Sequence, residues 1–237
     1  HLCPNFHALR LQHGGKVRAR QVLRLQHHNP QGSAYMERAK AQGQVQQYWR
    51  DYDQISDYLK RSVLISEDAQ FTSHSGFDWQ GIRYALQRNL EAGKPVAGGS
   101  TITQQLAKNL YLSGKRSYVR KVQEALIAMM LEMGLSKRRI LELYLNVAQW
   151  GHQIYGAEAA ARHYFQVSAA DLSMVQAAQL AAMLPRPNYY DFKGPTDYVQ
   201  QRAQWIQEQM AIVRIPDPGN LPLPPASDPE HRQGTSQ

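Results

Sequence analysis

The chain has 237 residues, of which 43% are hydrophobic, and this is enough for one large domain with a substantial core. The single cysteine, Cys3, excludes an internal disulfide framework. The sequence contains no stretch of about 18 apolar residues, so no transmembrane helix is predicted. The net charge of +8 is uneven, because residues 1–50 carry eight Lys or Arg and one acidic residue, Glu37. Such a basic segment favours either contact with an anionic surface, nucleic acid or lipid headgroups, or a solvated arm.

The two ends of the chain differ from its middle. Residues 1–30 show no sustained hydrophobic period, and their five histidines lack the spacing of metal ligands. We therefore predict a basic, disordered leader over residues 1–30. Residues 216–237 hold six of the twelve prolines and are predicted to form an extended, disordered tail. Residues 31–215 remain as the predicted folded domain.

Helix signals dominate this domain, and strand signals are sparse. Five helices are predicted from their N-cap residues, which are Asp78, Thr101, Ser117, Ser136 and Ser173. Thr101 with Gln104, and Ser173 with Gln176, form capping-box patterns. Further helices are predicted over residues 156–165 and 196–213, and stop signals stand at Gly93, Gly134 and Pro185. The pattern predicts a mainly α-helical domain with short loops.

The first stretch that packing alone does not explain is "ISEDAQFTSHSG". An apolar run over residues 63–65 ends at two adjacent carboxylates, Glu67 and Asp68, which Phe71 and His74 follow. Two acids by themselves would suit a solvated helix end. However, buried charge is costly unless it is paired or used. The apolar approach predicts that Glu67 lies in a low-dielectric environment, where a carboxylate becomes a useful proton acceptor or donor.

The second stretch, "AGGSTITQQLAKN", spans residues 97–109. On a helix, Thr101, Gln104, Gln105 and Lys108 share a face because they are three or four residues apart. Uncharged donors and acceptors suit a sugar, and Lys108 suits a phosphate. The alternative is a polar surface helix without a ligand.

The third stretch, "KRSYVRKVQE", places Arg120 and Lys121 at a predicted helix start. Cations oppose the macrodipole there unless an anion binds, and a diphosphate would resolve this conflict. The alternative is a surface salt bridge between Arg120 and Glu124. In the fourth stretch, "SKRRILELYLN", the apolar residues are predicted to be core. The three cations at positions 137–139 are interpreted as a solvated turn without a catalytic role.

In order and spacing, "EDAQFTSHSG", "GGSTITQQLAKN", "RKVQE" and "KRRILELYLN" resemble the motifs of the peptidoglycan glycosyltransferase family that polymerises lipid II. With no penicillin-binding domain downstream, the chain is similar to the monofunctional biosynthetic transglycosylases of that family. The resemblance covers roughly residues 31–215. It implies a lysozyme-like helical fold of two lobes, with a cleft between a larger lobe and a small lobe that touches the membrane.

The resemblance also implies an activity and roles for individual residues. The family makes β-1,4 glycan strands from lipid II by inverting glycosyl transfer and releases undecaprenyl diphosphate. By motif, Glu67 is the general base that takes the proton of the acceptor hydroxyl, and Glu124 is the second essential carboxylate. The cations expected near the diphosphate are Lys108, Arg120 and Lys121. The residues expected to shape the cleft are Asp68, Phe71, His74, Thr101, Gln105 and Asn109.

No tightly bound cofactor and no metal site are expected, although a divalent cation, Mg or Mn, assists the leaving group in members of this family. The expected partners are lipid II and a lipid-linked glycan chain, the membrane surface and other cell-wall synthesis or division proteins, but not nucleic acid. The expected location is the periplasmic face of the bacterial inner membrane. The membrane anchor of the family has no counterpart in residues 1–30, which are polar and basic. We expect Leu110, Tyr111 and Leu112 to seat the small lobe in lipid.

Two alternatives remain at this point. A lysozyme-type glycan hydrolase would use Glu67 as an acid, but it would not need the cations at positions 108, 120 and 121. A non-catalytic module that binds cell-wall glycan would tolerate the loss of both carboxylates. A nucleic-acid binder is the weakest alternative, because the excess charge lies in the leader and the core lacks a recognised module.

Overall fold

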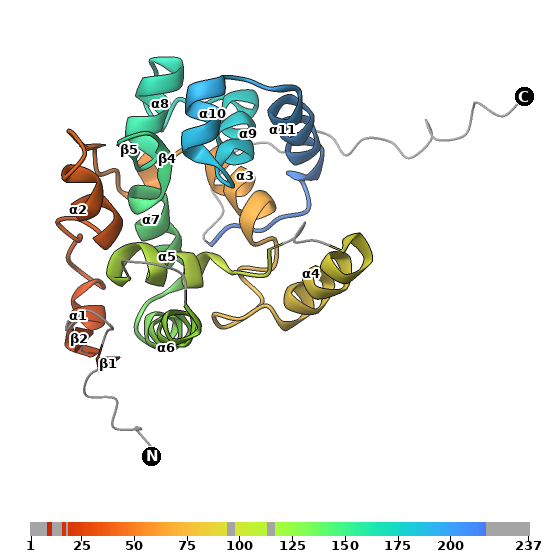
Figure 1. Cartoon of the computed structure of the whole chain (residues 1–237). Coiled ribbons are helices and arrows are strands. Elements are labelled where there is room, and N and C mark those ends of the chain that lie inside the picture. Colours follow the sequence, from red (N-terminus) through yellow and green to blue (C-terminus); the bar gives the residue numbers. More distant parts are fainter. Residues whose placement is uncertain (1–8, 11–15, 18, 94–97, 113–116, 217–237) are drawn as a thin grey trace, which may run out of the picture.

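The computed structural model describes residues 9–10, 16–17, 19–93, 98–112 and 117–216. These residues form eleven α-helices, one short 3-10 helix and five strands of two or three residues (Figure 1). The prediction of a mainly α-helical domain is therefore confirmed. The arrangement is consistent with the lysozyme-like helical domain that the motifs imply.

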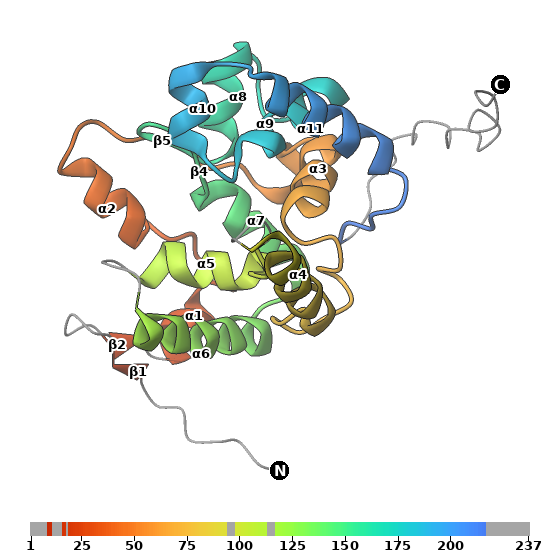
Figure 2. The same cartoon turned by 45° about the vertical axis from the view of Figure 1, so that its right-hand side comes forward.

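The helices fall into an upper and a lower group in both views of the molecule (Figures 1 and 2). The upper group comprises α8 (Ala157–Phe165), α9 (Met174–Met183), α10 (Pro187–Lys193) and α11 (Asp197–Gln209). The lower group comprises α1 (Ala19–Arg24), α4 (Trp79–Ala92), α5 (Ile102–Tyr111) and α6 (Tyr118–Gly134). The remaining helices are α2 (Ala34–Lys40), the 3-10 helix (Tyr52–Gln54), α3 (Asp57–Glu67) and α7 (Lys137–Val147).

The core joins the two groups. In the upper part, α9 packs against both α3 and α11, and in the lower part α5 packs against α6 and α7. Helix α9 buries four alanines, at positions 177, 178, 181 and 182, so its neighbours approach it closely. The buried residues of α7 continue this core between the groups. Helices α3 and α5, which carry the candidate site, are thus fixed by packing on both sides.

A small three-stranded sheet closes one side of the domain. Its strand order is β3 (Gln46–Gln47), β5 (Ile154–Tyr155) and β4 (Gln149–Gly151). Strand β3 pairs in parallel with β5, and β4 pairs with β5 as an antiparallel hairpin. In addition, β1 (Leu9–Arg10) and β2 (Lys16–Val17) pair with each other. The sequence predicts none of these strands, because they are too short to show an alternating pattern.

The predicted N-caps are confirmed. The side chains of Asp78, Thr101, Ser117, Ser136 and Ser173 each accept a hydrogen bond from the backbone N–H three residues later. Both predicted capping boxes are present. Helix α4 ends at Gly93, whose φ of 63° is left-handed and favours glycine. The last helix, α11, is shorter than predicted.

The prediction of a disordered leader is wrong for residues 19–30. Helix α1 forms there, and Val22 and Leu25 are buried. The side chain of Arg139 donates to the Leu25 carbonyl at 2.7 Å and to Asn29 Oδ1 at 2.7 Å. Arg139 is therefore not part of a solvated turn, because only 13% of its side chain is exposed. The contacts that order α1 come from distant segments, so residues 1–30 alone give no sign of them. The predicted tail over residues 216–237 lies outside the described residues except for Pro216.

The expected lipid contact at residues 110–112 is also wrong for two of the three residues. Leu110 and Leu112 are buried in the core, at 8% and 3% exposure, because α5 packs inward along this side. Large apolar side chains are instead exposed on α4 and α6. They are Trp79, Tyr84, Leu86, Leu90, Tyr118, Val119, Val122, Met129 and Met133. Of the helices that the structure describes, none is both long and apolar enough to span a bilayer.

Candidate active site

Helix α3 places Glu67 at its last residue. The helix begins at the Ser56 cap, whose hydroxyl accepts from the Tyr58 N–H, and it buries Val63 and Leu64 completely. The Asp68 N–H then closes the helix on the Leu64 carbonyl. The apolar run of the sequence therefore carries Glu67 to a helix C-terminus, where the helix dipole disfavours a negative charge.

The Glu67 carboxylate is held by uncharged donors. Gln105 Nε2 donates to Glu67 Oε2 at 2.8 Å, and Ser66 Oγ lies 3.3 Å from Glu67 Oε1. Burial raises the pKa of Glu67 above its ordinary value. The hydrogen bonds from Gln105 and Ser66 oppose this rise, and so do the positive charges of Lys108 and Arg202. A carboxylate with a raised pKa is a stronger base, which is what a general base requires.

Asp68 has a different role from its neighbour. Its Oδ1 lies 2.8 Å from His74 Nε2, and its Oδ2 accepts from the Ile102 N–H, at the first residue of α5, at 3.0 Å. The negative charge thus stabilises the N-terminus of α5. Asp68 therefore ties α3 to α5, and this tie fixes Glu67 relative to Gln105.

The other residues of the first motif support this arrangement from within. Phe71 is 1% exposed and packs edge-on against the His74 ring. The ammonium of Lys137 lies 4.4 Å from the centre of the Phe71 ring and 2.8 Å from Glu132 Oε1. Lys137 is thus a packing residue beneath the site rather than part of a solvated turn. Asn109, expected in the cleft, is also buried, at 9% exposure.

Only half of the predicted polar face of α5 points to the cleft. Thr101 and Gln104 are buried, and the Thr101 hydroxyl donates to the Gly76 carbonyl at 2.7 Å. Gln105 and Lys108 are partly exposed and line a pocket. The expectation of one shared face is therefore wrong, because Gln104 serves the capping box, and Thr101 serves it too while lining a second, smaller pocket.

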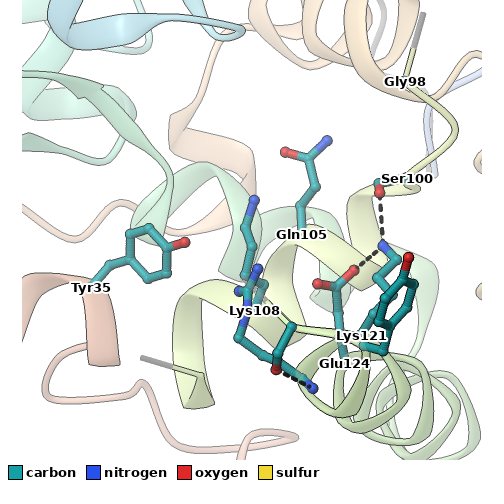
Figure 3. Close-up of a pocket in the computed structure, with 10 residues that line it drawn as sticks. Tyr35, Gly98, Ser100, Gln105, Lys108, Lys121 and Glu124 are labelled. Atoms are coloured by element: carbon teal, nitrogen blue, oxygen red, sulfur yellow. Dashed lines mark hydrogen bonds and ion pairs between the residues drawn. The ribbon is translucent and has the colours of Figure 1, made fainter. Parts of the chain in front are cut away.

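This pocket has a volume of about 1010 Å³ and lies between α2, α5 and α6 (Figure 3). Tyr35 of α2 stands on one side, Lys121 and Glu124 of α6 on the other, and Gln105 and Lys108 between them (Figure 3). Its lining residues are Tyr35, Gly98, Ser100, Gln105, Lys108, Ser117, Tyr118, Arg120, Lys121 and Glu124. A smaller pocket of about 270 Å³ includes Glu67, Asp68 and Thr101, and it shares Gly98 and Ser100 with the first. The two pockets are therefore neighbours, and Gln105, which lines the larger one, donates to Glu67 in the smaller one.

The second carboxylate, Glu124, pairs with Lys121, and not with Arg120 as in the alternative of a surface salt bridge. Its Oε1 lies 2.5 Å from Lys121 Nζ, which also donates to Ser100 Oγ at 3.0 Å. Among the described residues, Arg120 makes no ion pair with Glu124, and its Nε is buried without a hydrogen-bond partner. Burial lowers the pKa of Lys108, and the charge of Glu124 opposes this effect.

The pocket therefore holds more positive than negative charge. Lys108, Arg120 and Lys121 line it, and Glu124 is the one carboxylate among the lining residues that the structure describes. Arg120 and Lys121 belong to the first turn of α6, whose dipole attracts anions. An anion of two charges or more fits this arrangement better than a neutral sugar alone.

The described residues contain no group of three or more His, Cys, Asp or Glu that could hold a metal ion. Glu124 is the only acidic lining residue here, and Lys121 already occupies one of its oxygens. The protein residues alone therefore do not make a divalent-cation site, and we assign no chemical step to one.

Sequence reasoning missed three residues at this site. Tyr35 comes from α2, which no strong pattern predicts, and Ser100 follows the two glycines of the second motif. Arg202 lies on α11, stacks over the Trp205 ring at 4.2 Å and places its charge near Glu67. In the sequence, the one signal for Arg202 is its spacing from Trp205 on a predicted helix. This spacing does not indicate that Arg202 lies near Glu67, which is 135 residues earlier in the chain.

Comparison with known proteins decides the family. The Transglycosylase family model matches residues 33–211, well over half of the chain. The chain belongs to the transglycosylase family. It is therefore an enzyme that transfers glycosyl groups, and neither a hydrolase nor a passive glycan-binding module is needed to explain its two carboxylates.

Curated relatives of this transglycosylase carry the same description. The "Biosynthetic peptidoglycan transglycosylase" of Alcanivorax borkumensis is 83% identical over 209 residues, which cover 88% of this chain and 85% of the relative. The protein of that name from Methylobacillus flagellatus is 49% identical over 196 residues, covering 80% of this chain and 86% of the relative. The one from Thiobacillus denitrificans is 50% identical over 196 residues, covering 80% and 84%.

Proposed function

We propose that this transglycosylase polymerises lipid II into β-1,4-linked peptidoglycan glycan strands and releases undecaprenyl diphosphate. One observation carries the proposal: a carboxylate with a raised pKa, Glu67, stands next to a large pocket lined with cations. A base is needed where a sugar hydroxyl attacks, and cations are needed where a diphosphate leaves. The family and its relatives support this assignment.

In the proposed reaction, the 4-hydroxyl of the acceptor sugar attacks the anomeric carbon of the donor. The new bond joins the acceptor oxygen to that carbon, and the bond from the carbon to the diphosphate oxygen breaks. Glu67 takes the proton of the hydroxyl, and the diphosphate departs with the bonding electrons. Attack opposite the leaving group inverts the anomeric centre, as in an inverting glycosidase in which a sugar alcohol replaces water.

In this proposal, each pocket binds a different substrate. The smaller pocket, with Glu67, would receive the acceptor sugar, and the larger one would receive the donor diphosphate. Lys108, Arg120 and Lys121 would stabilise the charge that grows on the diphosphate as it departs. The unpartnered Nε of Arg120 supports this role, because a buried guanidinium nitrogen without an acceptor is costly until an anion arrives. Glu124 would keep Lys121 in place through their ion pair.

The same proposal places the enzyme at the periplasmic face of the inner membrane, where a lipid-linked substrate resides. The exposed apolar side chains of α4 and α6 support contact with lipid, since Leu90 and Tyr118 are 74% and 95% exposed. Both helices belong to the lower group, which includes the cation-lined wall of the larger pocket.

Incubation with labelled lipid II, with and without moenomycin, tests the proposal on a gel that resolves glycan strands. We expect a ladder of long strands that moenomycin suppresses, together with release of undecaprenyl diphosphate. A parallel incubation with finished peptidoglycan should release no soluble fragments. Fragments from finished peptidoglycan, and no ladder from lipid II, would contradict the proposal and favour lysozyme-type hydrolysis.

A further inference from the structure

Tyr144 of α7 reaches the candidate base through one intermediate side chain. Its hydroxyl donates to Gln105 Oε1 at 3.2 Å, and Gln105 Nε2 donates to Glu67 Oε2 at 2.8 Å. The three residues come from α7, α5 and α3, of which α5 packs against α7. Tyr144 is 2% exposed and lines neither of the two pockets described above. It is thus too deep to touch a substrate directly.

The direction of these hydrogen bonds determines the charge that Glu67 prefers. A Gln105 amide with its Nε2–H toward Glu67 stabilises the ionised carboxylate, whereas one with its Oε1 toward Glu67 would stabilise the protonated acid. Burial raises the pKa of Tyr144 well above its ordinary value, and the charges of Glu67 and Asp68 act in the same direction. The phenol therefore keeps its proton and always has one to donate.

We propose that Tyr144 is a positioning residue that holds the Gln105 amide in the orientation that makes Glu67 a base rather than an acid. The hydroxyl of Tyr144 occupies Gln105 Oε1, so the amide N–H groups are left for the carboxylate. This inference rests on the proposed function, in which Glu67 removes a proton from the acceptor. It adds a residue that acts only through Gln105.

The other charged groups around Glu67 do not replace this contact. Lys108 on α5 and Arg202 on α11 act on Glu67 through their charge and do not form a hydrogen bond with it. Asp68 is committed to His74 and to the first N–H of α5. In the part of the chain that the structure describes, Tyr144 is the one hydrogen-bond donor to Gln105 Oε1.

The first test is Tyr144→Phe, which keeps the buried ring and removes the hydroxyl. Without its donor, the Gln105 amide is free to rotate, and the pKa of Glu67 rises further. We expect the acidic limb of the pH profile of kcat/KM for lipid II to move up by about one pH unit, so that kcat/KM falls about tenfold on that limb. The matched control is Tyr52→Phe, which removes another tyrosine hydroxyl, bonded to the Pro216 carbonyl at 2.5 Å. It should leave the pH profile unchanged.

A double-mutant cycle separates positioning from general packing. Gln105→Met removes both ends of the amide. If Tyr144 acts only through Gln105, then Tyr144→Phe should cost nothing more in the Gln105→Met background. Full additivity of the two substitutions, or a Tyr144→Phe enzyme with an unchanged pH profile, would overturn the inference. If Tyr144→Phe does not fold, Gln105→Met alone must still show the upward shift of the acidic limb.

Titration of the Glu67 side-chain carboxyl by NMR, in the absence of substrate, provides a readout that does not depend on activity. Its pKa should be higher in Tyr144→Phe than in the wild type and in Tyr52→Phe. An enzyme that does not polymerise lipid II but shows this shift would contradict the proposed function and retain the positioning role. Polymerisation by the wild type without any shift would contradict only the positioning role.

Discussion

Two glutamates, the half-buried Glu67 and the fully buried Glu158, occupy opposite helix ends and have opposite charge preferences. Glu67 is the last residue of α3 and accepts from the neutral side chains of Gln105 and Ser66. Glu158 lies in the first turn of α8 and accepts from Arg50 at 2.8 Å and from Arg162 at 2.7 Å. Burial raises the pKa of Glu67. Burial also acts to raise the pKa of Glu158, but its hydrogen bonds outweigh this and lower the value to about 2.

The difference shows that burial alone does not decide what a carboxylate does. At Glu158, two guanidinium groups, the Ala169 N–H and the helix dipole all favour the anion, so its charge is permanent. At Glu67, the helix dipole opposes the anion and the nearest hydrogen-bond donors are neutral, so the carboxyl group can both accept and release a proton. The first arrangement serves stability, and the second suits proton transfer.

The largest expected effect is that of Glu67→Gln on activity. Glutamine keeps the shape of the side chain but cannot accept a proton, so polymerisation should fall by about 10²- to 10⁴-fold. Binding of lipid II should be nearly unchanged, because the cations that meet the diphosphate remain. Labelled lipid II serves for both the rate and the binding measurement.

Glu67→Gln should lower the activity of the enzyme but should not lower its stability. The folded pKa of Glu67 is raised, so its ionisation weakens the fold as the pH rises through that value. Glu67→Gln should therefore unfold at the same or a higher denaturant concentration than the wild type at pH 7. A variant that retains activity within tenfold of the wild type would show that Glu67 is not the base.

The next effect is on stability, at Glu158. Its folded pKa of about 2 lies below its ordinary value of 4.5, so its contribution is present above pH 4.5 and is lost as the pH falls toward 2. The loss should amount to about 3 kcal/mol of unfolding free energy. Glu158→Gln should lower the stability at pH 7 by a similar amount and flatten the dependence on acid. Urea unfolding at several pH values measures both.

The control for Glu158 is Glu208→Gln, on the exposed side of α11. This substitution should change the unfolding free energy by about 0.5 kcal/mol or less at pH 7. If Glu158→Gln behaves like Glu208→Gln, then the two guanidinium groups do not distinguish the buried carboxylate from a surface one. The contrast with Glu67 would then rest on the helix ends alone.

A smaller effect is expected on the donor side, for Lys108→Ala and Arg120→Ala. Each removes one of three cations from the larger pocket, so the KM for the lipid-linked donor should rise about tenfold. Neither variant should lose its helical circular dichroism signal, because both side chains are partly exposed. Lys193→Ala, an exposed cation on α10, is the matched control and should not change KM. Unfolding of Arg120→Ala would indicate a structural ion pair instead.

The smallest effect is expected from Ser66→Ala. The Ser66 hydroxyl has one hydrogen and two acceptors, Glu67 Oε1 at 3.3 Å and the Ala181 carbonyl at 3.1 Å, so its bond to Glu67 is weak. We expect a two- to threefold loss in rate, about 0.5 kcal/mol, and an upward shift of the acidic limb by about 0.3 pH units. Ser62→Ala, in the same helix, removes a buried hydroxyl without a partner among the described residues and should leave the profile unchanged.

Much of the helical fold was predictable, because capping is a local property. A serine, threonine or aspartate bonds to a backbone N–H three residues later, so Thr101 and Ser173 reveal their helices without knowledge of the rest of the chain. Helix α3 is harder to predict from the sequence, because it also buries two cationic side chains, Lys60 and Arg61. The partner of Arg61, the Val213 carbonyl, lies 152 residues away in sequence. No local pattern can show that such a charge is satisfied.

The candidate site was predictable in its residue types but not in their directions. The motifs name Asp68 and Thr101 together with Gln105, but a sequence does not say which side chain faces the substrate and which faces the core. The structure turns Thr101 into a cap and Asp68 into a link to α5, and it leaves Gln105 beside Glu67. Arg202 could not be assigned, because only the packing of α11 brings it near Glu67.

The parallel pairing of β3 with β5 has a consequence for how the domain folds. Helix α2 and strand β3 are joined to the β4–β5 hairpin by long-range bonds, such as that of Gln153 Nε2 to the Ala39 carbonyl across 114 residues. Contacts between such distant segments form slowly, because the loop between them must close first. We expect Tyr35 to dock through this pairing together with the packing of α2 against α5. The wall of the larger pocket that Tyr35 forms is therefore expected to form late in folding, after the local helices.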